Sequence, residues 1–362
     1  MVEILVRHGD RTPYHIFNFS INANYKYPSG LGLLTPLGVN QTKMVGERIK
    51  NNYGLKKGLY NPFSNDCPET IFVRSTSSQR AIDTASNIID GMFLSNVSGV
   101  EATEQNYKTL YNQTQIPIVI VPQQEDSRMH HAFPCKKRAK IYRSRFNDTN
   151  IQKHVFYKYR DIIELFKTKG NTEITDYHEF REVFDSIFTE KHYFGLKQPD
   201  WLTEEVYERY FKAINESVDY TNGAAGYDQP ESVEIKKNLL GELFYEMVSN
   251  LKDKAIFGPE KPNIIIYSAH DITVFMISLS LKIKKKIIGD SWMHYTGSIG
   301  FELHLQKATG KYFVRVIWSD NAYTEYKPVT KYVSGCGGED YCELGVFTKI
   351  SEKYMLAPGS EC

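Results

Sequence analysis

The sequence predicts an α/β fold in which helices flank a doubly wound, mainly parallel sheet, with a second, mostly helical cap domain. Two observations support this prediction. Short apolar runs are each followed by a segment with helical periodicity, which is the order of elements in a parallel sheet. Between Pro122 and about Pro230 this alternation stops, and charged and aromatic residues recur at mostly helical intervals.

The first strand and the first helix open the chain. Residues 2–6 are a short, mostly apolar run, typical of a strand that is buried on both faces. After a loop, Leu34-Thr35-Pro36 predicts a helix start, with Thr35 as the N-cap and Pro36 at the first helical position. This helix should end near Gly54, and Gln41 is the one polar residue on its inner stripe.

A second strand and helix follow in the same order. Residues 70–74 form another compact run, and residues 75–78 supply the hydroxyl groups that cap a helix. The apolar positions of that helix extend from Ala81 to Met92 at helical spacing.

Two further runs complete the parallel strands. Residues 116–121 and 263–268 are rich in β-branched side chains, and residues 273–281 follow the second of them as an apolar helix. Residues 299–306 and 312–319 flank Ala308-Thr309-Gly310 and predict a hairpin, which would add antiparallel strands. We therefore expect an α/β catalytic domain from residues 1–122 and 231–362, and a helical insertion from residues 123–230.

Composition excludes several classes of protein. The chain has 362 residues, with 44 basic and 43 acidic side chains and a formal net charge of +1. This balance argues against a nucleic-acid-binding surface, so any anion site must be local. The longest apolar stretch, residues 273–281, is roughly half of the ~20 residues that a membrane-spanning helix needs.

Cysteines and glycosylation sequons indicate the secretory pathway. The five cysteines include no C-x-x-C pair, which argues against a zinc site. Six Asn-x-Ser/Thr sequons begin at Asn18, Asn40, Asn96, Asn112, Asn147 and Asn215. We expect a secreted, lysosomal or lumenal protein. No signal peptide precedes residue 2, so we interpret Met1 as a trimmed or introduced start.

The strongest chemical signal is the motif Arg7-His8-Gly9-Asp10-Arg11-Thr12-Pro13, directly after the first predicted strand. Ligands bind at this edge of open α/β sheets. Two arginines around one histidine are tolerated chiefly where an anion binds, and arginine suits bidentate binding of phosphate. An imidazole among arginines has a lowered pKa and presents a free nitrogen that can attack phosphorus. The motif therefore predicts a phosphoryl site.

The chain resembles the histidine acid phosphatases, the second branch of the histidine phosphatase superfamily, over nearly its whole length. It has RHGDRTP at 7–13, LTPLG at 34–38, RST at 74–76 followed by Arg80, SAHD at 268–271, and a cysteine-bearing tail. Within that family it resembles the animal acid phosphatases of the prostatic and lysosomal type.

The resemblance implies an enzyme that hydrolyses phosphate monoesters through a covalent phosphohistidine intermediate. His8 would be the nucleophile and Asp271 the general acid. The phosphoryl oxygens would be bound by Arg7, Arg11, Arg74 and His270. The resemblance also implies the disulfides Cys336–Cys342 and Cys135–Cys362, with Cys67 left as a free or buried thiol.

The residues themselves agree with this assignment. Arg74 and the pair His270-Asp271 each lie where a predicted strand gives way to a helix, so they should reach the same sheet edge as His8. Taken alone, Arg74 would be an exposed cation and Asp271 a helix cap. Because Asp271 must start protonated, we expect an acidic pH optimum. Three arginines can neutralise the phosphoryl group, and no residues have metal-ligand spacing, so no metal or other cofactor is expected.

Several alternatives stay open at this point. The scaffold could serve a catalytically silent extracellular ligand-binding protein, or a phytase-like phosphatase of inositol phosphates. Tyr14, His15, Phe17 and Phe19 either line the leaving-group side or pack the loop. His130-His131 could edge the pocket but better fit an exposed surface, and the lysines of 282–286 fit a solvated helix end better than a phosphoinositide or heparin contact. Expected substrates are small phosphomonoesters, with phosphopeptides and lysophospholipids included and nucleic acid excluded. The animal relatives suggest a homodimer.

Overall fold

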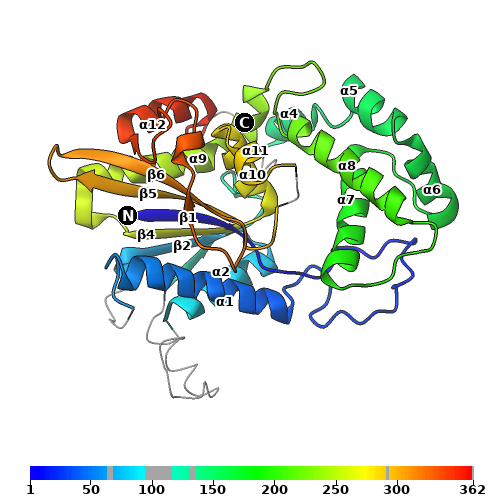
Figure 1. The fold of residues 1–362 in the computed structure, drawn as a ribbon, viewed down its shortest axis with the longest axis horizontal. Coiled ribbons are helices and arrows are strands. Elements are labelled where there is room, and N and C mark those ends of the chain that lie inside the picture. The colour runs from blue at the N-terminus through cyan, green and yellow to red at the C-terminus, as the bar shows by residue number, and fades with distance from the viewer. Residues whose placement is uncertain (63–67, 94–115, 130–134, 291–292, 361–362) are drawn as a thin grey trace.

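The computed structural model describes residues 1–62, 68–93, 116–129, 135–290 and 293–360 (Figure 1). The strands are β1 (Val2–Arg7), β2 (Ile71–Ser75), β3 (Ile118–Ile120), β4 (Ile264–Ala269), β5 (Ser298–Gln306), β6 (Lys311–Ser319), β7 (Lys327–Pro328) and β8 (Cys342–Glu343). The longer helices are α1 (Pro36–Ile49), α2 (Gln79–Phe93), α4 (Lys136–Arg143), α6 (Arg160–Gly170), α7 (Tyr177–Phe188), α8 (Glu204–Thr221), α9 (Val233–Phe257), α10 (Asp271–Ser280) and α12 (Leu344–Ser351); α5 (Thr149–Ile151) and α11 (Lys284–Ile287) are short. The predicted α/β fold class is confirmed.

All the strands belong to one mixed sheet with the order β3-β2-β4-β1-β5-β6-β7, and β8 pairs with β6. The strands β3, β2, β4 and β1 run parallel, and the others pair antiparallel. The antiparallel part is larger than the single hairpin predicted from the sequence. In the parallel part, Arg7 pairs with Ala269 and Ser75 with Ser268. The strands β1, β4 and β2 therefore end level with one another, and the residues after them emerge at one edge.

Each face of the sheet is covered by helices, which explains the nearly continuous apolar runs of its strands. Val2, Ile4 and Val6 of β1 pack with the side chains of α1 and α2 on one face. Leu5 points to the opposite face, where α9, α10 and α12 contribute to the core. This is the doubly wound arrangement that the sequence predicts. Thr35 caps α1, accepting a hydrogen bond from the Gly38 N–H, and Pro36 is at its first position.

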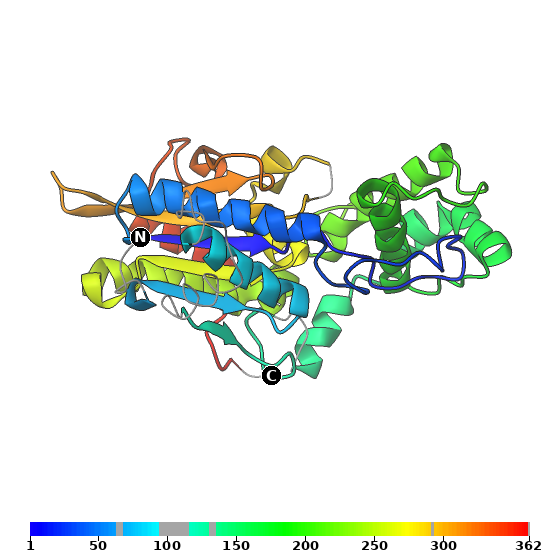
Figure 2. The same cartoon turned by 90° about the horizontal axis from the view of Figure 1, so that it is seen from below.

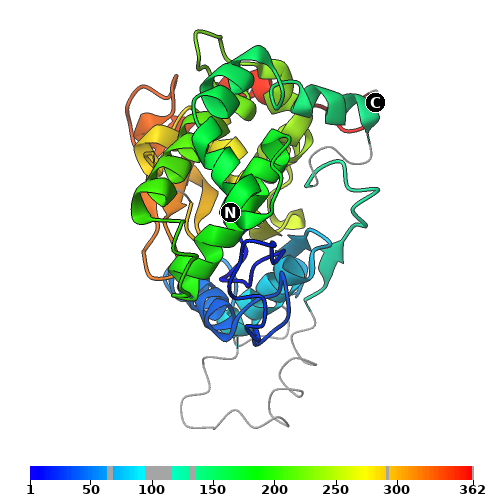
Figure 3. The same cartoon turned by 90° about the vertical axis from the view of Figure 1, so that its right-hand side faces the viewer.

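A helical lobe lies beyond the carboxyl ends of the parallel strands, as Figures 1 and 2 show. Between β3 and β4 the described chain contains helices and no strand. The loop between β1 and α1 runs into this lobe (Figure 3). There Phe19 packs edge to face on Phe166, and the Ser20 hydroxyl donates to Glu190 at 2.9 Å. The apolar core of the lobe is continuous with the core under α9 and α10. The domain boundaries near residues 123 and 230 stay a prediction.

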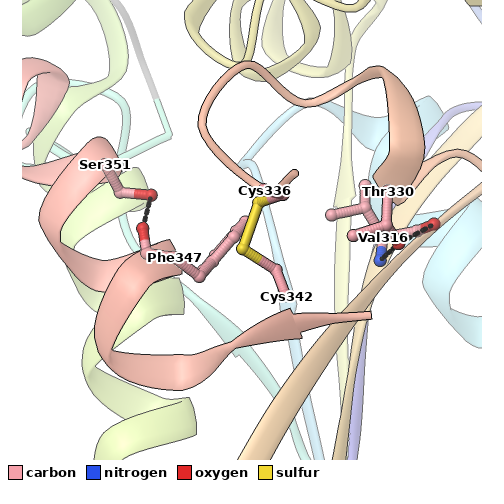
Figure 4. Close-up of a disulfide and its surroundings, with 6 residues drawn as sticks. All are labelled: Val316, Thr330, Cys336, Cys342, Phe347 and Ser351. Atoms are coloured by element: carbon pink, nitrogen blue, oxygen red, sulfur yellow. Dashed lines mark hydrogen bonds between the residues drawn. A yellow bond between two sulfur atoms is a disulfide. The ribbon is translucent and has the colours of Figure 1, made fainter. Parts of the chain in front are cut away.

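One of the two predicted disulfides lies within the described residues. Cys336 is bonded to Cys342, with a Cα–Cα distance of 5.0 Å, and the bond ties a loop to β8 beside Phe347 of α12 (Figure 4). Cys67 and Cys362 lie outside the described residues. The pairing of Cys135 with Cys362 therefore stays a prediction.

The sequons differ in their exposure. Asn18, Asn40 and Asn147 are exposed, and Asn215 is half-buried. Asn96 and Asn112 lie outside the described residues. None of the described helices combines the length and the apolar character that crossing a bilayer requires.

Close packing of α1 on α2 depends on two glycines. A Cβ at Gly91 would lie 2.0 Å from the Lys43 carbonyl oxygen, and a Cβ at Gly46 would lie 2.1 Å from that of Ile88. We therefore expect Gly91→Ala to force the helices apart and to lower the free energy of unfolding by about 1–3 kcal/mol. Urea denaturation would measure this.

Gly345 provides the matched control for this substitution. It lies in α12, and no atom comes within 4 Å of a Cβ built on it. Gly345→Ala should be neutral or stabilise the chain by up to about 1 kcal/mol, because alanine favours the helix. Equal stability of the Gly91→Ala variant and the wild-type protein would contradict the packing account.

Candidate active site

A cavity of about 520 Å³ opens at the carboxyl edge of the parallel strands. His8 and Arg11 line it from the loop after β1, Arg80 from the first turn of α2, and His270 and Asp271 from the junction of β4 with α10. The other side of the cavity is formed by the lobe helices α4 and α7, through residues such as Arg143 and Arg181. Segments far apart in the chain therefore meet around one space.

His8 is fixed so that one ring nitrogen is available. Its backbone N–H donates to the Ala269 carbonyl at 3.0 Å, and its Nδ1 lies 2.9 Å from the Gly9 carbonyl oxygen. Because a carbonyl only accepts, Nδ1 carries the proton, and the lone pair of a neutral ring is on Nε2. Burial, followed by the charges of Arg80 and Arg7, holds the pKa of His8 well below its usual range. The ring is therefore a neutral base even in moderate acid.

The loop that carries His8 is fastened directly to the start of α1. The Asp10 N–H donates to Gln41 at 2.9 Å, which explains the polar residue on the inner stripe of that helix. The Thr35 hydroxyl donates to the Asp10 carboxylate at 2.5 Å. A Cβ at Gly9 would lie 2.6 Å from the Gly38 carbonyl oxygen, so only glycine allows this approach.

Asp271 lies at the first position of α10, and its carboxylate is paired with Arg7, the residue that precedes His8. Its Oδ2 is 3.1 Å from Nη2 of Arg7, and its Oδ1 accepts from the Ile272 N–H at 2.7 Å. Burial alone would raise the pKa of Asp271, but the charges of Arg7 and Arg181 outweigh it and lower the pKa to about 2. Without a ligand, this carboxyl group is therefore ionised.

Two guanidinium groups face the cavity close to each other. Arg11 is held by two 2.9 Å contacts to the Asp185 carboxylate, and Arg80 donates to Nδ1 of His270 at 3.1 Å. The ring of Tyr14 lies 4.2 Å from the Arg11 carbon Cζ and 4.5 Å from that of Arg80, so both cations contact it. The Nε atoms of both arginines are buried and have no partner within the described residues.

This arrangement favours an anion. Burial and the charge of Arg11 lower the pKa of Arg80 to about 9, which is the expected result of confining two cations without enough negative charge. A phosphoryl group would supply both the charge and the acceptors that these groups lack. Among the described residues, no three or more His, Cys, Asp or Glu side chains are grouped as metal ligands would be.

The structure does not bring Arg74 into the cavity, contrary to the prediction. Its guanidinium donates to the buried Asp126 at 2.8 Å and lies 3.6 Å from Glu246. Arg80, six positions later, occupies the place that was expected for Arg74. Arg7 does not line the cavity either, because its guanidinium is engaged by Asp271 and by the Met293 carbonyl.

His270 lines the cavity, but its geometry differs from that of a phosphate donor. An arginine N–H can only donate, so Nδ1 of His270 accepts from Arg80. Its Nε2 then carries the proton and lies 3.0 Å from the Thr76 hydroxyl oxygen. His270 therefore orients Arg80.

The weaker candidates divide between the cavity and the core. Tyr14 and His15 line the cavity, whereas Phe17 and Phe19 stack on each other, and Phe19 is buried. In the 282–286 segment, Lys284 is buried and paired with Asp219 at 3.1 Å. His130 and His131 lie outside the described residues.

Sequence reasoning gave no role to Arg80, Asp185 or Arg181. The sequence did carry a signal for Arg80. A cation in the first turn of a helix interacts unfavourably with the helix dipole, so an arginine at this position suggests a role other than helix stabilisation. Arg181 and Asp185 are spaced by four residues, which puts them on one face of α7. Nothing in the sequence shows that this face meets the catalytic loop.

Comparison with known proteins agrees with this geometry. The family model of the histidine phosphatase superfamily (branch 2) matches residues 1–319. Human prostatic acid phosphatase is 26% identical over 96% of this chain and 83% of its own length, and bovine lysosomal acid phosphatase is 24% identical over 97% and 77%.

Solved structures with the same fold include bacterial phytases. Hafnia alvei phytase in complex with tartrate has a TM-score of 0.66 at 16% identity, covering 98% of this chain and 96% of that one. Citrobacter braakii phytase has a TM-score of 0.64 at 15% identity, covering 98% and 97%. The chain therefore belongs to branch 2 of the histidine phosphatase superfamily, among the histidine acid phosphatases, and is a phosphatase.

Proposed function

We propose that this phosphatase transfers the phosphoryl group of a monoester to Nε2 of His8 and then to water. The observation that carries the proposal is the state of His8: a buried, neutral ring with its proton on Nδ1 and its lone pair on Nε2, near Arg80, which forms no ion pair with a described residue. In the first step the N–P bond forms as the P–O bond to the leaving group breaks. In the second step water attacks phosphorus, and the N–P bond breaks.

Arg11 and Arg80 bind the phosphoryl oxygens in this proposal, and their charge stabilises the transition state. Arg7 contributes positive charge from behind the site and holds Asp271, to which it is ion-paired at 3.1 Å. His270 and Tyr14 keep Arg80 in position. Arg74 has a structural role, because it compensates the buried charge of Asp126.

Asp271 is the general acid for the leaving oxygen and the general base for the attacking water. Its pKa of about 2 requires that a proton be brought to it. A phosphate dianion bound between the arginines raises this pKa, and a substrate monoanion carries the needed proton into the site. One proton is thus shared between the carboxylate and the substrate, then passes to the leaving oxygen as the P–O bond breaks.

We place the enzyme in the secretory pathway, as a secreted or lysosomal glycoprotein. Three exposed sequons and the Cys336–Cys342 disulfide support this, because disulfides persist in oxidising compartments. The names of the prostatic and lysosomal relatives agree with it. Small phosphomonoesters are the substrate class.

His8→Ala should abolish turnover of p-nitrophenyl phosphate at pH 5, because it removes the imidazole that accepts the phosphoryl group in this proposal. Asp271→Asn should lower kcat about 10²–10⁴-fold on alkyl phosphates, whose leaving groups need a proton, and less on p-nitrophenyl phosphate. Steady-state kinetics on both substrates would measure this. His154→Ala and Asp161→Asn are matched controls at residues that do not line the cavity. A His8→Ala variant with wild-type kcat would contradict the proposal.

The two arginines of the second motif should respond differently to substitution. Arg80→Met should lower kcat/KM at least about 100-fold, as expected when a donor to the transition state is lost. Arg74→Met should instead lower the free energy of unfolding by about 3 kcal/mol, because Asp126 keeps a buried charge without its partner. The double variant Arg74→Met/Asp126→Asn removes both charges and should restore much of that stability. Kinetics and thermal denaturation of the three variants would decide between the two arginines.

The pH dependence follows from the depressed pKa values. Because its pKa is depressed, His8 stays unprotonated when the pH falls below the ordinary pKa of a histidine, and it can still act as the nucleophile. The shared proton is lost as the pH rises through the second ionisation of a phosphomonoester, at about pH 6. We therefore expect kcat/KM to be maximal below about pH 6. A maximum in alkali, measured with a substrate panel on folded protein, would contradict this assignment.

A further inference from the structure

We propose that the lobe side of the cavity is a second anion subsite, formed by Arg181 of α7 and Arg143 of α4. It would bind a negative group, phosphate or carboxylate, on the leaving-group part of the substrate. This inference rests on the proposed function, since the second group is carried by the monoester that His8 attacks. It predicts a preference for phosphomonoesters that carry a second anion.

The charge balance of the cavity wall supports this subsite. Arg11, Arg80, Arg143 and Arg181 line the cavity together with the carboxylates of Glu182, Asp185 and Asp271. Asp185 is paired with Arg11, and Asp271 is paired with Arg7. Glu182 lies 3.3 Å from His178. Asp185 and Asp271 are therefore neutralised by other arginines, and no ion pair joins any of these carboxylates to Arg143 or Arg181 among the described residues.

Arg143 and Arg181 themselves lack ion-pair partners among the described residues, since neither has a carboxylate within ion-pair distance. Arg181 is half-buried and is hydrogen-bonded to Tyr142, while its Nε is buried without a hydrogen-bond partner in this part of the chain. Tyr142 satisfies part of its hydrogen-bonding capacity but brings no negative charge. A ligand anion would supply that charge.

The position of Arg181 on α7 also supports the subsite. Arg181 lies one helical turn before Asp185, the residue that holds Arg11 with two 2.9 Å contacts. Side chains four positions apart on a helix have their Cβ atoms about 5–6 Å apart on one face. The subsite is therefore adjacent to Arg11, on the lobe side of the cavity. The charge of Arg181 also lowers the pKa of Asp271. An anion bound to Arg181 would offset part of this charge and so raise the pKa of Asp271.

Substrate pairs that differ only in the second charge test the proposal. 3-Phosphoglycerate and glycerol 3-phosphate differ by a carboxylate in place of a hydroxymethyl group, and fructose 1,6-bisphosphate and fructose 6-phosphate differ by a phosphate. We expect the wild-type kcat/KM to favour the doubly anionic member of at least one pair by about tenfold or more, the contribution of one charge-assisted hydrogen bond. The two pairs distinguish a carboxylate from a phosphate as the second group.

Substitution then assigns the preference to residues. Arg181→Ser should lower this selectivity ratio about tenfold, and Arg143→Ser should lower it less, because Arg143 is exposed. Arg181→Lys keeps the charge and should retain part of the selectivity ratio. If the Arg181→Ser protein does not fold, the partial loss of selectivity in Arg181→Lys is the test. Arg160→Ser removes an exposed cation of the same lobe and is the matched control. Wild-type ratios near one, or an equal loss in Arg160→Ser, would overturn the subsite.

Failure of the subsite and failure of the proposed function give different results. If the wild-type protein does not hydrolyse p-nitrophenyl phosphate, the proposed function is wrong. The same pairs can then be compared by calorimetric binding to the His8→Ala variant, with and without Arg181→Ser. A binding preference that depends on Arg181 supports the subsite, and equal affinities refute it.

Discussion

The level ending of β1, β4 and β2 is the constraint on which the rest of the structure depends. Because Arg7 pairs with Ala269 and Ser75 with Ser268, the residues that follow these strands are delivered to one sheet edge at the same height. The rings of His8 and His270 consequently lie with their centroids 5.6 Å apart although 262 positions separate them in the sequence. The loop after β1 is then fixed by α1, and the first turn of α2 brings Arg80 to the same edge. A slip of one residue in either parallel pairing would reverse the direction of every side chain concerned.

The site also confines several positive charges in a small volume. Arg7, Arg11 and Arg80 surround an imidazole that stays neutral, and each is restrained by a different device: an ion pair to Asp271, an ion pair to Asp185, and a hydrogen bond to His270. The Tyr14 ring contacts two of them. The lobe takes part through Asp185, so the helical segment fixes a catalytic-loop arginine as well as covering the cavity. This coupling makes the two parts of the molecule one functional unit, in keeping with their continuous apolar core.

Most of the sheet and its flanking helices could be predicted from the sequence, because β1, β2 and β4 are compact apolar runs and a recognisable helix start, such as Thr35-Pro36, comes later along the chain from each. The strands β7 and β8 could not, since two-residue strands carry no periodicity. His8, Arg11, His270 and Asp271 were named from the family resemblance and from their positions directly or shortly after a strand, and all four line the cavity. The resemblance and its place at the end of a strand both assigned phosphate binding to Arg74, yet its side chain is paired with Asp126 and Glu246. Asp185 meets Arg11 across 174 positions, and such a contact is decided by tertiary packing.

The central claim is that Nε2 of His8 becomes bonded to phosphorus during turnover. The most direct measurement is rapid quenching of the wild-type enzyme with substrate into alkaline denaturant, which preserves phosphohistidine, followed by mass spectrometry of the peptide that contains His8. The account predicts a phosphoryl group on His8 that appears and decays at the rate of turnover. Steady hydrolysis with no phosphorylated enzyme, or a phosphoryl group on another residue, would contradict it.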